Sequence, residues 1–176
     1  MRLKPLLFVL FATSLGTAAP ALANPTSGTP PYAALMVDYV AADQAMWGVT
    51  IAPTHYDRAY PDWGYYAGFA WGPSERLDLP EPEAGKVEQY MGRFGLSYEM
   101  VQGLYLTGGV SYWVKETHHT NGITPLCTDC TPVWTSKKDY TWGGELGLRY
   151  NLGQNLVIGV GYNWATESAM FSLGLR

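Results

Sequence analysis

The densest cluster of chemically capable side chains lies between residues 116 and 138. It contains His118, His119, Cys127, Asp129 and Cys130. Cys127 and Cys130 are the only two cysteines of the chain. In an exported protein, a Cys-x-x-Cys pair predicts a disulfide that closes a loop. The alternative is a zinc or copper site built from reduced thiols and imidazoles. We favour the Cys127–Cys130 disulfide, because an oxidising compartment disfavours free thiols, and we expect no metal and no cofactor.

A second polar stretch, residues 73–86, is rich in carboxylates. It carries Glu75, Asp78, Glu81 and Glu83 against Arg76 and Lys86. Carboxylates at this density are able to bind divalent cations. The alternative is a solvated loop that its prolines stiffen.

The segments that position these two stretches alternate apolar and polar residues. From residue 140 to 152, one parity reads Tyr-Trp-Gly-Leu-Leu-Tyr-Leu and the other reads Thr-Gly-Glu-Gly-Arg-Asn. Side chains of a strand alternate between its two faces. The pattern therefore predicts a β-strand with an apolar outer face and a polar inner face, as in a strand that separates lipid from a lumen.

Eight such strands are expected, at about 32–40, 45–52, 63–72, 87–99, 104–115, 140–152, 155–164 and 169–176. They predict an all-β fold, an eight-stranded antiparallel transmembrane up-and-down β-barrel. The links at 100–103 and 153–154 are short, whereas those at 73–86 and 116–138 are long. This alternation places the long links outside the cell and both chain ends in the periplasm. The long link at 53–62, with His55 and Asp57 as ordinary turn residues, fits this pattern less well.

Residues 1–23 have the features of a secretory signal peptide. Arg2 and Lys4 precede an apolar run, and Ala21-Leu22-Ala23 forms a small-x-small cleavage site. The expected organisation is a signal peptide at 1–23, a polar Pro-rich leader at 24–31 and one barrel domain at 32–176. Without the signal peptide the chain has 9 basic and 15 acidic residues, which argues against a nucleic-acid partner. No later segment has 18 consecutive apolar residues, so we expect no transmembrane helix.

The strand pattern, the export signal and the ending Gly-Val-Gly-Tyr-Asn … Phe-Ser-Leu-Gly-Leu-Arg (159–163 and 171–176) together resemble the small eight-stranded outer-membrane barrels. These include the OmpA membrane domain and OmpX-like proteins, and the resemblance covers residues 32–176. It implies a monomer in the outer membrane of a Gram-negative bacterium, in contact with lipid and lipopolysaccharide. Members of the family commonly end in an aromatic residue, whereas this chain ends in Arg176.

The lumen of an eight-stranded barrel is just wide enough for side chains to fill. Parity points six charged residues into it, namely Asp38, Arg93, Glu99, Glu145, Arg149 and Arg176. Buried charges need partners, so we expect a cross-lumen network of ion pairs and hydrogen bonds. Glu145 and Arg149 are about 13 Å apart along one strand, and each should pair with another strand. A narrow channel is the alternative.

The stretch His118-x-Thr120-Asn121 is similar to the His-x-Ser-Asn stretch of outer-membrane lipid A 3-O-deacylases. In those eight-stranded barrels the His is the base, the Ser is the nucleophile and a Glu orients the His. Here Thr120 stands for the Ser, Glu145 faces the lumen and Glu116 lies in the predicted loop, so the orienting group is missing.

We therefore predict a non-enzymatic protein with a structural or surface-interaction role. The outside loops 73–86 and 116–138 would carry this role by contacting an extracellular ligand. A deacylase that uses His118 and Thr120, and a narrow channel, are the alternatives.

Overall fold

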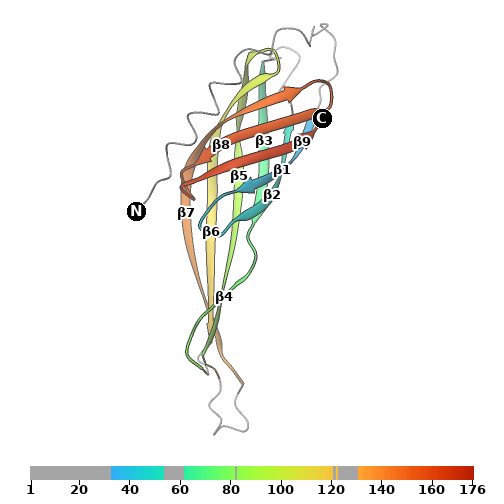
Figure 1. Ribbon diagram of the computed structural model, residues 1–176. Helices are drawn as coiled ribbons and strands as arrows, with labels where there is room; N and C mark the ends of the chain where they lie inside the picture. Colours follow the sequence, from blue (N-terminus) through green and yellow to red (C-terminus); the bar gives the residue numbers. More distant parts are fainter. Residues whose placement is uncertain (1–32, 54–61, 82, 121, 123–130) are drawn as a thin grey trace, which may run out of the picture.

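The computed structural model describes residues 33–53, 62–81, 83–120, 122 and 131–176. Every regular element in these residues is a β-strand (Figure 1). In chain order the strands are β1 (Ala33–Val40), β2 (Met46–Pro53), β3 (Trp63–Trp71), β4 (Glu75–Leu77), β5 (Ala84–Val101), β6 (Leu104–Thr120), β7 (Trp134–Leu152), β8 (Leu156–Asn163) and β9 (Ser168–Leu175). Within these ranges no helix is long and apolar enough to cross a membrane.

Eight of these nine strands close into an antiparallel barrel. The first strand pairs with the last, with Tyr39 opposite Phe171. The ring also needs β3 to pair with β5, and it does so from Trp63–Tyr98 to Trp71–Tyr90. The short strand β4 pairs with β5 outside the ring. The predicted all-β, eight-stranded antiparallel up-and-down barrel is confirmed.

Alternate residues of the strands face the lumen and the surroundings. In β1, Met36 and Asp38 are buried while Leu35 is 60% and Val37 is 53% exposed. The same alternation gives the whole barrel an apolar outer surface, with exposed Leu35, Val37, Val49, Ile51, Phe69, Phe94, Leu96, Val110, Leu146 and Leu173. A soluble monomer rarely exposes an apolar surface of this extent, so the barrel needs an apolar environment.

The ring of Tyr66 lies along the inner wall of the barrel, over glycines of the next two strands. The Tyr66 hydroxyl, from β3, lies where a Cβ would stand at Gly95 of β5 or Gly109 of β6. A side chain at either position would collide with Tyr66 and with a backbone carbonyl oxygen. The carbonyl is that of Gly108 for a side chain at Gly95, and that of Phe94 for one at Gly109. The two glycines therefore make room for the buried ring of Tyr66.

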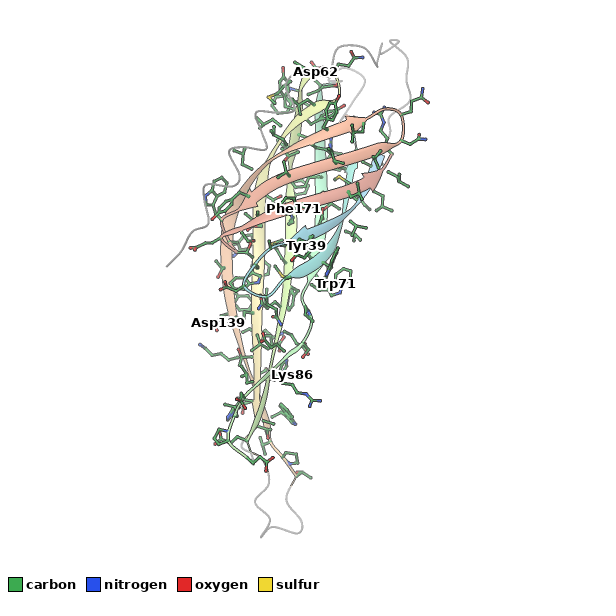
Figure 2. All side chains as sticks on the ribbon, viewed as in Figure 1. Tyr39, Asp62, Trp71, Lys86, Asp139 and Phe171 are labelled. Carbon is green, nitrogen blue, oxygen red and sulfur yellow. The ribbon has the colours of Figure 1, made fainter. Side chains whose placement is uncertain are left out.

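Three strands extend further than the sequence predicted. β5 begins at Ala84 rather than at residue 87, β6 continues to Thr120 rather than to 115, and β7 begins at Trp134 rather than at 140. Beyond the barrel these strands and β4 form the protruding sheet, defined as residues 75–77, 84–89, 115–120 and 134–139. In Figure 1 it extends below the ring, and in Figure 2 Lys86 and Asp139 lie on it beyond Tyr39 and Trp71.

Parts of the predicted loops 73–86 and 116–138 are thus strands, which corrects the prediction. Charged residues here occupy both faces of the sheet, so the apolar alternation that marks the barrel strands is absent. Opposite charges on neighbouring strands replace apolar pairs, as where Glu116 stands opposite Lys138.

The two tight turns are confirmed. Gly103 has φ +79° between β5 and β6, and Gly153 has φ +66° between β7 and β8. Both angles lie in the left-handed region that glycine adopts readily. These turns lie at the end of the barrel opposite the protruding sheet, and we call this end the inner end.

Several predictions fall outside the described residues. They are the signal peptide at 1–23, the leader at 24–31, the link with His55 and Asp57, and the predicted loop residues Asn121, Cys127, Asp129 and Cys130.

Candidate functional site

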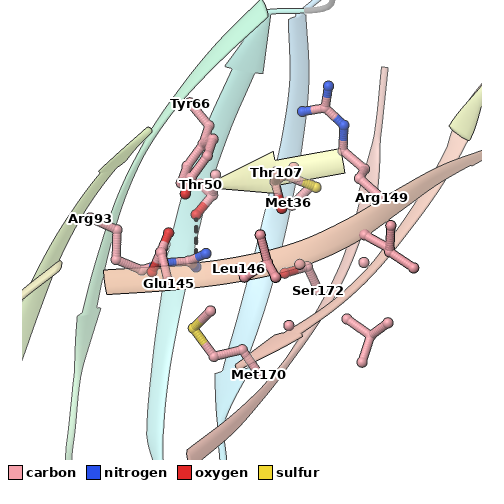
Figure 3. A pocket seen from close by; sticks show the side chains of 15 residues that line it. Met36, Thr50, Tyr66, Arg93, Thr107, Glu145, Leu146, Arg149, Met170 and Ser172 are labelled. Atoms are coloured by element: carbon pink, nitrogen blue, oxygen red, sulfur yellow. Dashed lines mark hydrogen bonds and ion pairs between the residues drawn. The ribbon is translucent and has the colours of Figure 1, made fainter. Parts of the chain in front are cut away.

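Arg93 lies in the middle of the lumen and holds carboxylates from two other strands. Its Nε is 2.9 Å from Glu145 Oε2, and its Nη1 is 3.2 Å from Asp38 Oδ2. The Arg93 side chain is 9% exposed, and the two carboxylate side chains are 1–2% exposed. Figure 3 shows Arg93 and Glu145 pointing toward one another. The two ion pairs connect β5 with β1 and with β7 through the interior of the barrel.

Neutral side chains complete the bonding of both carboxylates. Thr50 and Ser172 donate their hydroxyl hydrogens to Asp38. The Asn163 amide donates to Glu145 Oε2 at 3.0 Å. Several bonds to each carboxylate offset the cost of burying its charge. Parity also places Asn163 on the inner side. Because Asn163 is uncharged, it was not among the charged residues predicted to form the network.

Glu99 and Arg176, which were predicted to face the lumen, lie at the inner end of the barrel, apart from this cluster. Glu99 Oε1 accepts a hydrogen bond of 2.6 Å from the Gly103 backbone N–H, which fixes the β5–β6 turn. Arg176 donates to the carbonyl oxygens of Gly153 and Gln154 in the neighbouring turn. Both side chains therefore hold turns in place.

Arg149 also lies apart from the Arg93 cluster. Its guanidinium carbon is 4.6 Å from the centre of the Tyr105 ring, and its Nη2 is 3.4 Å from Ser97 Oγ. No carboxylate of the described residues forms an ion pair with it. The predicted lumen charges thus divide into a central cluster around Arg93, a second group in which Arg149 interacts with Tyr105 and electrostatically with Glu99, and Arg176 at the last turn.

The protruding sheet carries a row of charges on one face. Lys86 Nζ lies 2.7 Å from Glu88 Oε1, and Lys138 Nζ lies 3.1 Å from Glu116 Oε2. His118 lies between the two carboxylates, with its Nε2 3.5 Å from Glu116 Oε1 and 4.0 Å from Glu88 Oε2. The hydrogen bond from Lys86 lowers the pKa of the Glu88 carboxyl, and the hydrogen bond with Glu116 raises the pKa of Lys138.

The opposite face of the protruding sheet is partly apolar. His119 Nε2 lies 3.6 Å from Glu83 Oε2. An open hollow on this face is lined by Leu77, Leu79, Thr117, His119, Thr135, Lys137 and Asp139. In the described part of the chain, no three His, Cys, Asp or Glu residues are placed to hold a metal ion.

Aromatic side chains mark two levels of the outer surface. Near the protruding sheet, Tyr39 packs on Trp47 at 5.0 Å and Tyr112 on Trp142 at 4.6 Å between ring centres. Near the inner turns, Trp63 packs on Tyr98 at 5.0 Å. The apolar surface of the barrel lies between these levels. Aromatic belts of this kind lie at the two interfaces of a membrane.

One edge of the protruding sheet has no strand beside it. β7 pairs with β8 only from Glu145 to Leu152, and the Trp164 N–H binds the Gly144 carbonyl oxygen. Residues 134–142 of β7 pair with β6 on one side, and none of the described strands pairs with their other side. We call this unpaired side the free edge.

Comparison with known proteins finds relatives at the level of fold. No family model matches the chain, and no curated protein matches it. Among solved structures, Ail, the attachment invasion locus protein of Yersinia pestis, in complex with the heparin analogue sucrose octasulfate, matches with a TM-score of 0.52 and 14% identity over 81% of this chain and 91% of that one. Another structure of Ail gives a TM-score of 0.50 with 14% identity and the same coverage. The N-terminal β-barrel domain of Pseudomonas aeruginosa OprF gives a TM-score of 0.40 with 12% identity, over 81% and 95%.

The chain has the fold of the small eight-stranded outer-membrane barrels. The strand pattern of the sequence indicated this resemblance, and the match to the Ail structures confirms it for the fold.

Two residues of this outer-membrane-type barrel, His118 and Thr120, were the candidates for deacylase chemistry. Both lie in β6 two residues apart, which places them on one face of the sheet. Glu116, expected in a loop, lies in the same strand within 3.5 Å of His118, so an orienting carboxylate is present after all. The Thr120 side chain is buried, and its Oγ1 accepts a hydrogen bond from the Gly122 N–H.

Proposed function

We propose that this chain is a monomeric, non-enzymatic protein of a Gram-negative outer membrane whose protruding sheet binds a partner outside the cell. The apolar surface between two aromatic levels supports the membrane position. The lumen supports a structural role for the barrel, because its central charges are paired with one another. We also propose that export removes residues 1–23, which the intact mass of the mature protein would test.

The free edge of β7 is the observation that carries the surface role. Nine residues, 134–142, present backbone N–H and C=O groups on a side with no described partner strand. An unpaired edge can accept an extended segment of another chain as an additional strand. Exposed Trp134, Tyr140 and Trp142 along this edge offer apolar contacts for alternate side chains of such a segment.

The charges of the protruding sheet favour a polypeptide partner over a polyanion. The sheet has five basic residues, Arg76, Lys86, Lys115, Lys137 and Lys138, and four acidic residues, Glu75, Glu88, Glu116 and Asp139. Ail has been solved with a sulfated sugar, but a sheet of mixed charge lacks the basic patch that attracts a polyanion. We therefore propose that the ligand is a protein with an extended segment.

Removing the outer half of the β6–β7 hairpin tests the surface role. Lys115 stands opposite Asp139, so residues 116–138 can be replaced by an Asn-Gly turn that keeps the register. Cells that display the intact chain should be retained on surfaces coated with extracellular-matrix protein, and cells that display the shortened chain should not. Neither should be retained on heparin. Equal retention of both variants would contradict a role for the protruding sheet.

Two proline variants test the free edge itself. Consecutive backbone N–H groups of a strand point to opposite neighbours, so of Thr135 and Ser136 one points to β6 and the other to the free edge. We expect Thr135→Pro and Ser136→Pro each to reduce retention, while only one weakens amide protection in β6. If the variant with intact β6 protection binds normally, the free edge is not the binding element.

A lipid A deacylase remains the second candidate, because Glu116 lies near His118. The position of His118 argues against this enzyme. His118 lies six residues beyond Tyr112 of the aromatic level, about 20 Å along β6, whereas the acyl chains of lipid A lie inside the membrane. Lipid A mass spectra from cells with the intact chain and with Thr120→Ala should be identical. An acyl loss that disappears in Thr120→Ala would establish the enzyme instead.

A further inference from the structure

The even-numbered residues of the free edge turn their backbone groups away from β6. Gly144 shows the direction, because its carbonyl oxygen faces β8 and accepts a hydrogen bond of 3.0 Å from the Trp164 N–H. Gly143 faces the other way, since its carbonyl oxygen accepts a hydrogen bond from Ser111 Oγ of β6. Backbone groups of successive residues alternate between the two neighbours of a strand. The even-numbered residues from 134 to 142 therefore each offer a donor and an acceptor to a partner strand.

The side chains along this edge are complementary to a second copy of themselves. Residues 134–142 read Trp-Thr-Ser-Lys-Lys-Asp-Tyr-Thr-Trp. When two copies are laid antiparallel with Lys138 opposite Lys138, the other opposite pairs are Trp134 with Trp142, Thr135 with Thr141, Ser136 with Tyr140 and Lys137 with Asp139. Aromatic pairs, threonine pairs and pairs of opposite charge stabilise antiparallel strands. Lys137 and Asp139 are accessible to a partner, with side chains 78% and 56% exposed.

Neighbouring registers lack this complementarity. A pair centred on Lys137 sets that lysine opposite itself, and a pair centred on Asp139 sets that aspartate opposite itself. Among centres from 136 to 140, only Lys138 brings an aspartate opposite a lysine. The two Lys138 side chains also meet there, but each is bound to Glu116 of its own chain at 3.1 Å. Lysines on an exposed edge ordinarily discourage pairing, whereas this register makes Lys137 attractive.

We propose that a second copy of this chain occupies the free edge, and that the two β7 strands pair antiparallel about Lys138. The even-numbered residues of one copy then lie opposite even-numbered residues of the other, so each such pair exchanges two backbone hydrogen bonds. The two protruding sheets become one continuous sheet. The inference rests on the proposed function in one respect, because it needs the protruding sheet to be open outside the cell.

The antiparallel direction places the two barrels in membranes that face each other. In Figure 1 the free edge continues away from the ring, so Trp142 lies near the barrel and Trp134 lies about 26 Å further along β7. Pairing sets Trp134 of each copy beside Trp142 of the other, with the barrels at opposite ends of the shared sheet. Two copies in one membrane would instead run parallel about a two-fold axis, with identical charges side by side, and like charges destabilise paired strands. Each copy therefore remains a monomer in its own membrane.

An exchange of charges tests the register. The mature protein is reconstituted in phosphatidylcholine vesicles, and clustering of the vesicles is followed by light scattering. The intact chain should cluster them. Lys137→Asp and Asp139→Lys should each weaken clustering about tenfold, because like charges then face each other. Vesicles with Lys137→Asp mixed with vesicles with Asp139→Lys should cluster again, because every 137–139 pair between them joins opposite charges.

A matched pair of variants separates the register from net charge. Lys86→Asp and Glu75→Lys make the same charge changes on β5 and β4, away from the free edge. Each should cluster vesicles as the intact chain does. If these two variants lose clustering alone and regain it when mixed, net charge drives the association and the proposal is overturned.

Cysteine cross-linking gives a second measurement, in a chain whose own two cysteines are replaced by serine. Lys138→Cys places the two thiols at the centre of the pair, where opposite Cα atoms lie about 5.5 Å apart and a disulfide can form. Ser136→Cys places them about 13 Å apart and should give no cross-linked dimer under the same mild oxidant. Equal cross-linking of the two variants, or clustering that both charge variants retain, would overturn the proposal.

These measurements contain no matrix protein, so they separate this inference from the proposed function. Cells that are retained on matrix protein while the vesicles do not cluster would overturn the pairing of two copies and leave the proposed surface role standing. Clustering with the expected charge dependence, without retention on matrix protein, would support the pairing and contradict a matrix ligand.

Discussion

Arg93 faces Glu145 inside the barrel, with its Nε 2.9 Å from the Oε2 atom of that carboxylate. Because the same guanidinium also binds Asp38, one side chain neutralises two buried negative charges. Arg93 thus connects strand β5 with strands β1 and β7 through the lumen.

Replacing Arg93 should destabilise the barrel strongly. Arg93→Met leaves Asp38 and Glu145 buried without a counter-charge, and breaking a buried ion pair in this way costs about 3–5 kcal/mol. Urea unfolding in micelles measures the loss. The exposed arginine of β4 provides the control, since Arg76→Met should change the unfolding free energy by less than about 0.5 kcal/mol. Similar losses in both variants would mean that the central ion pairs contribute little.

The position of Tyr66 on the inner wall predicts a difference between two glycines. Gly109→Ala places a Cβ against the Tyr66 hydroxyl and the Phe94 carbonyl oxygen, and should cost about 1–3 kcal/mol. Gly92→Ala meets no atom within 4 Å and should be tolerated. Urea unfolding of the two variants, side by side, checks this. A loss in Gly92→Ala as large as in Gly109→Ala would show that glycine content, rather than room for Tyr66, sets the stability.

The ion pairs of the protruding sheet predict its response to pH. The folded pKa of Glu88 lies below its unfolded value, so its contribution to stability is present above the unfolded pKa and is lost as the pH falls through the folded pKa. For Lys138, whose folded pKa is raised, the contribution is present below the unfolded pKa and is lost as the pH rises through the folded one.

An NMR titration of the Glu88 carboxyl tests the cause of its shift. Lys86→Gln should return the pKa of Glu88 toward its ordinary value, because the hydrogen bond from Lys86 is the largest contribution. Lys137→Gln, which removes a lysine bound to Asp139 instead, should leave the pKa of Glu88 unchanged. Equal shifts in the two variants would assign the effect to net charge.

The membrane position predicts where a new charge is harmful. Val110 is 54% exposed on the outer surface of the barrel, and Val110→Lys should cost about 2–4 kcal/mol at the middle of a bilayer. Val133, 67% exposed beside the protruding sheet, should accept the same change. Folding into lipid vesicles, read from heat-dependent gel mobility, measures both. Normal folding of Val110→Lys would contradict a lipid-facing surface.

The sequence predicts the barrel well because one face of each strand must be apolar. Parity alone placed Asp38, Arg93 and Glu145 on the inner side. It could not tell which carboxylate binds which arginine, because partners on distant strands depend on register and side-chain reach. Arg149 shows the limit, since it faces inward as expected and yet binds Tyr105 and Ser97 instead of a carboxylate.

The protruding sheet was harder to predict for a physical reason. Its two faces both carry polar residues, so strand and loop have the same hydrophobic pattern between 116 and 120 and between 134 and 139. Cross-strand charge pairs such as Glu116 with Lys138 hold it together, and these become visible only when the register is known.

Labelling of lysines on intact cells tests the central claim most directly. Beyond residue 4, every lysine of the chain lies on the protruding sheet, at Lys86, Lys115, Lys137 and Lys138. A membrane-impermeant amine reagent added to cells that display the chain should modify these lysines, as peptide mass spectrometry would show. Modification that occurs only after the cell envelope is broken would contradict a sheet that projects from the cell surface.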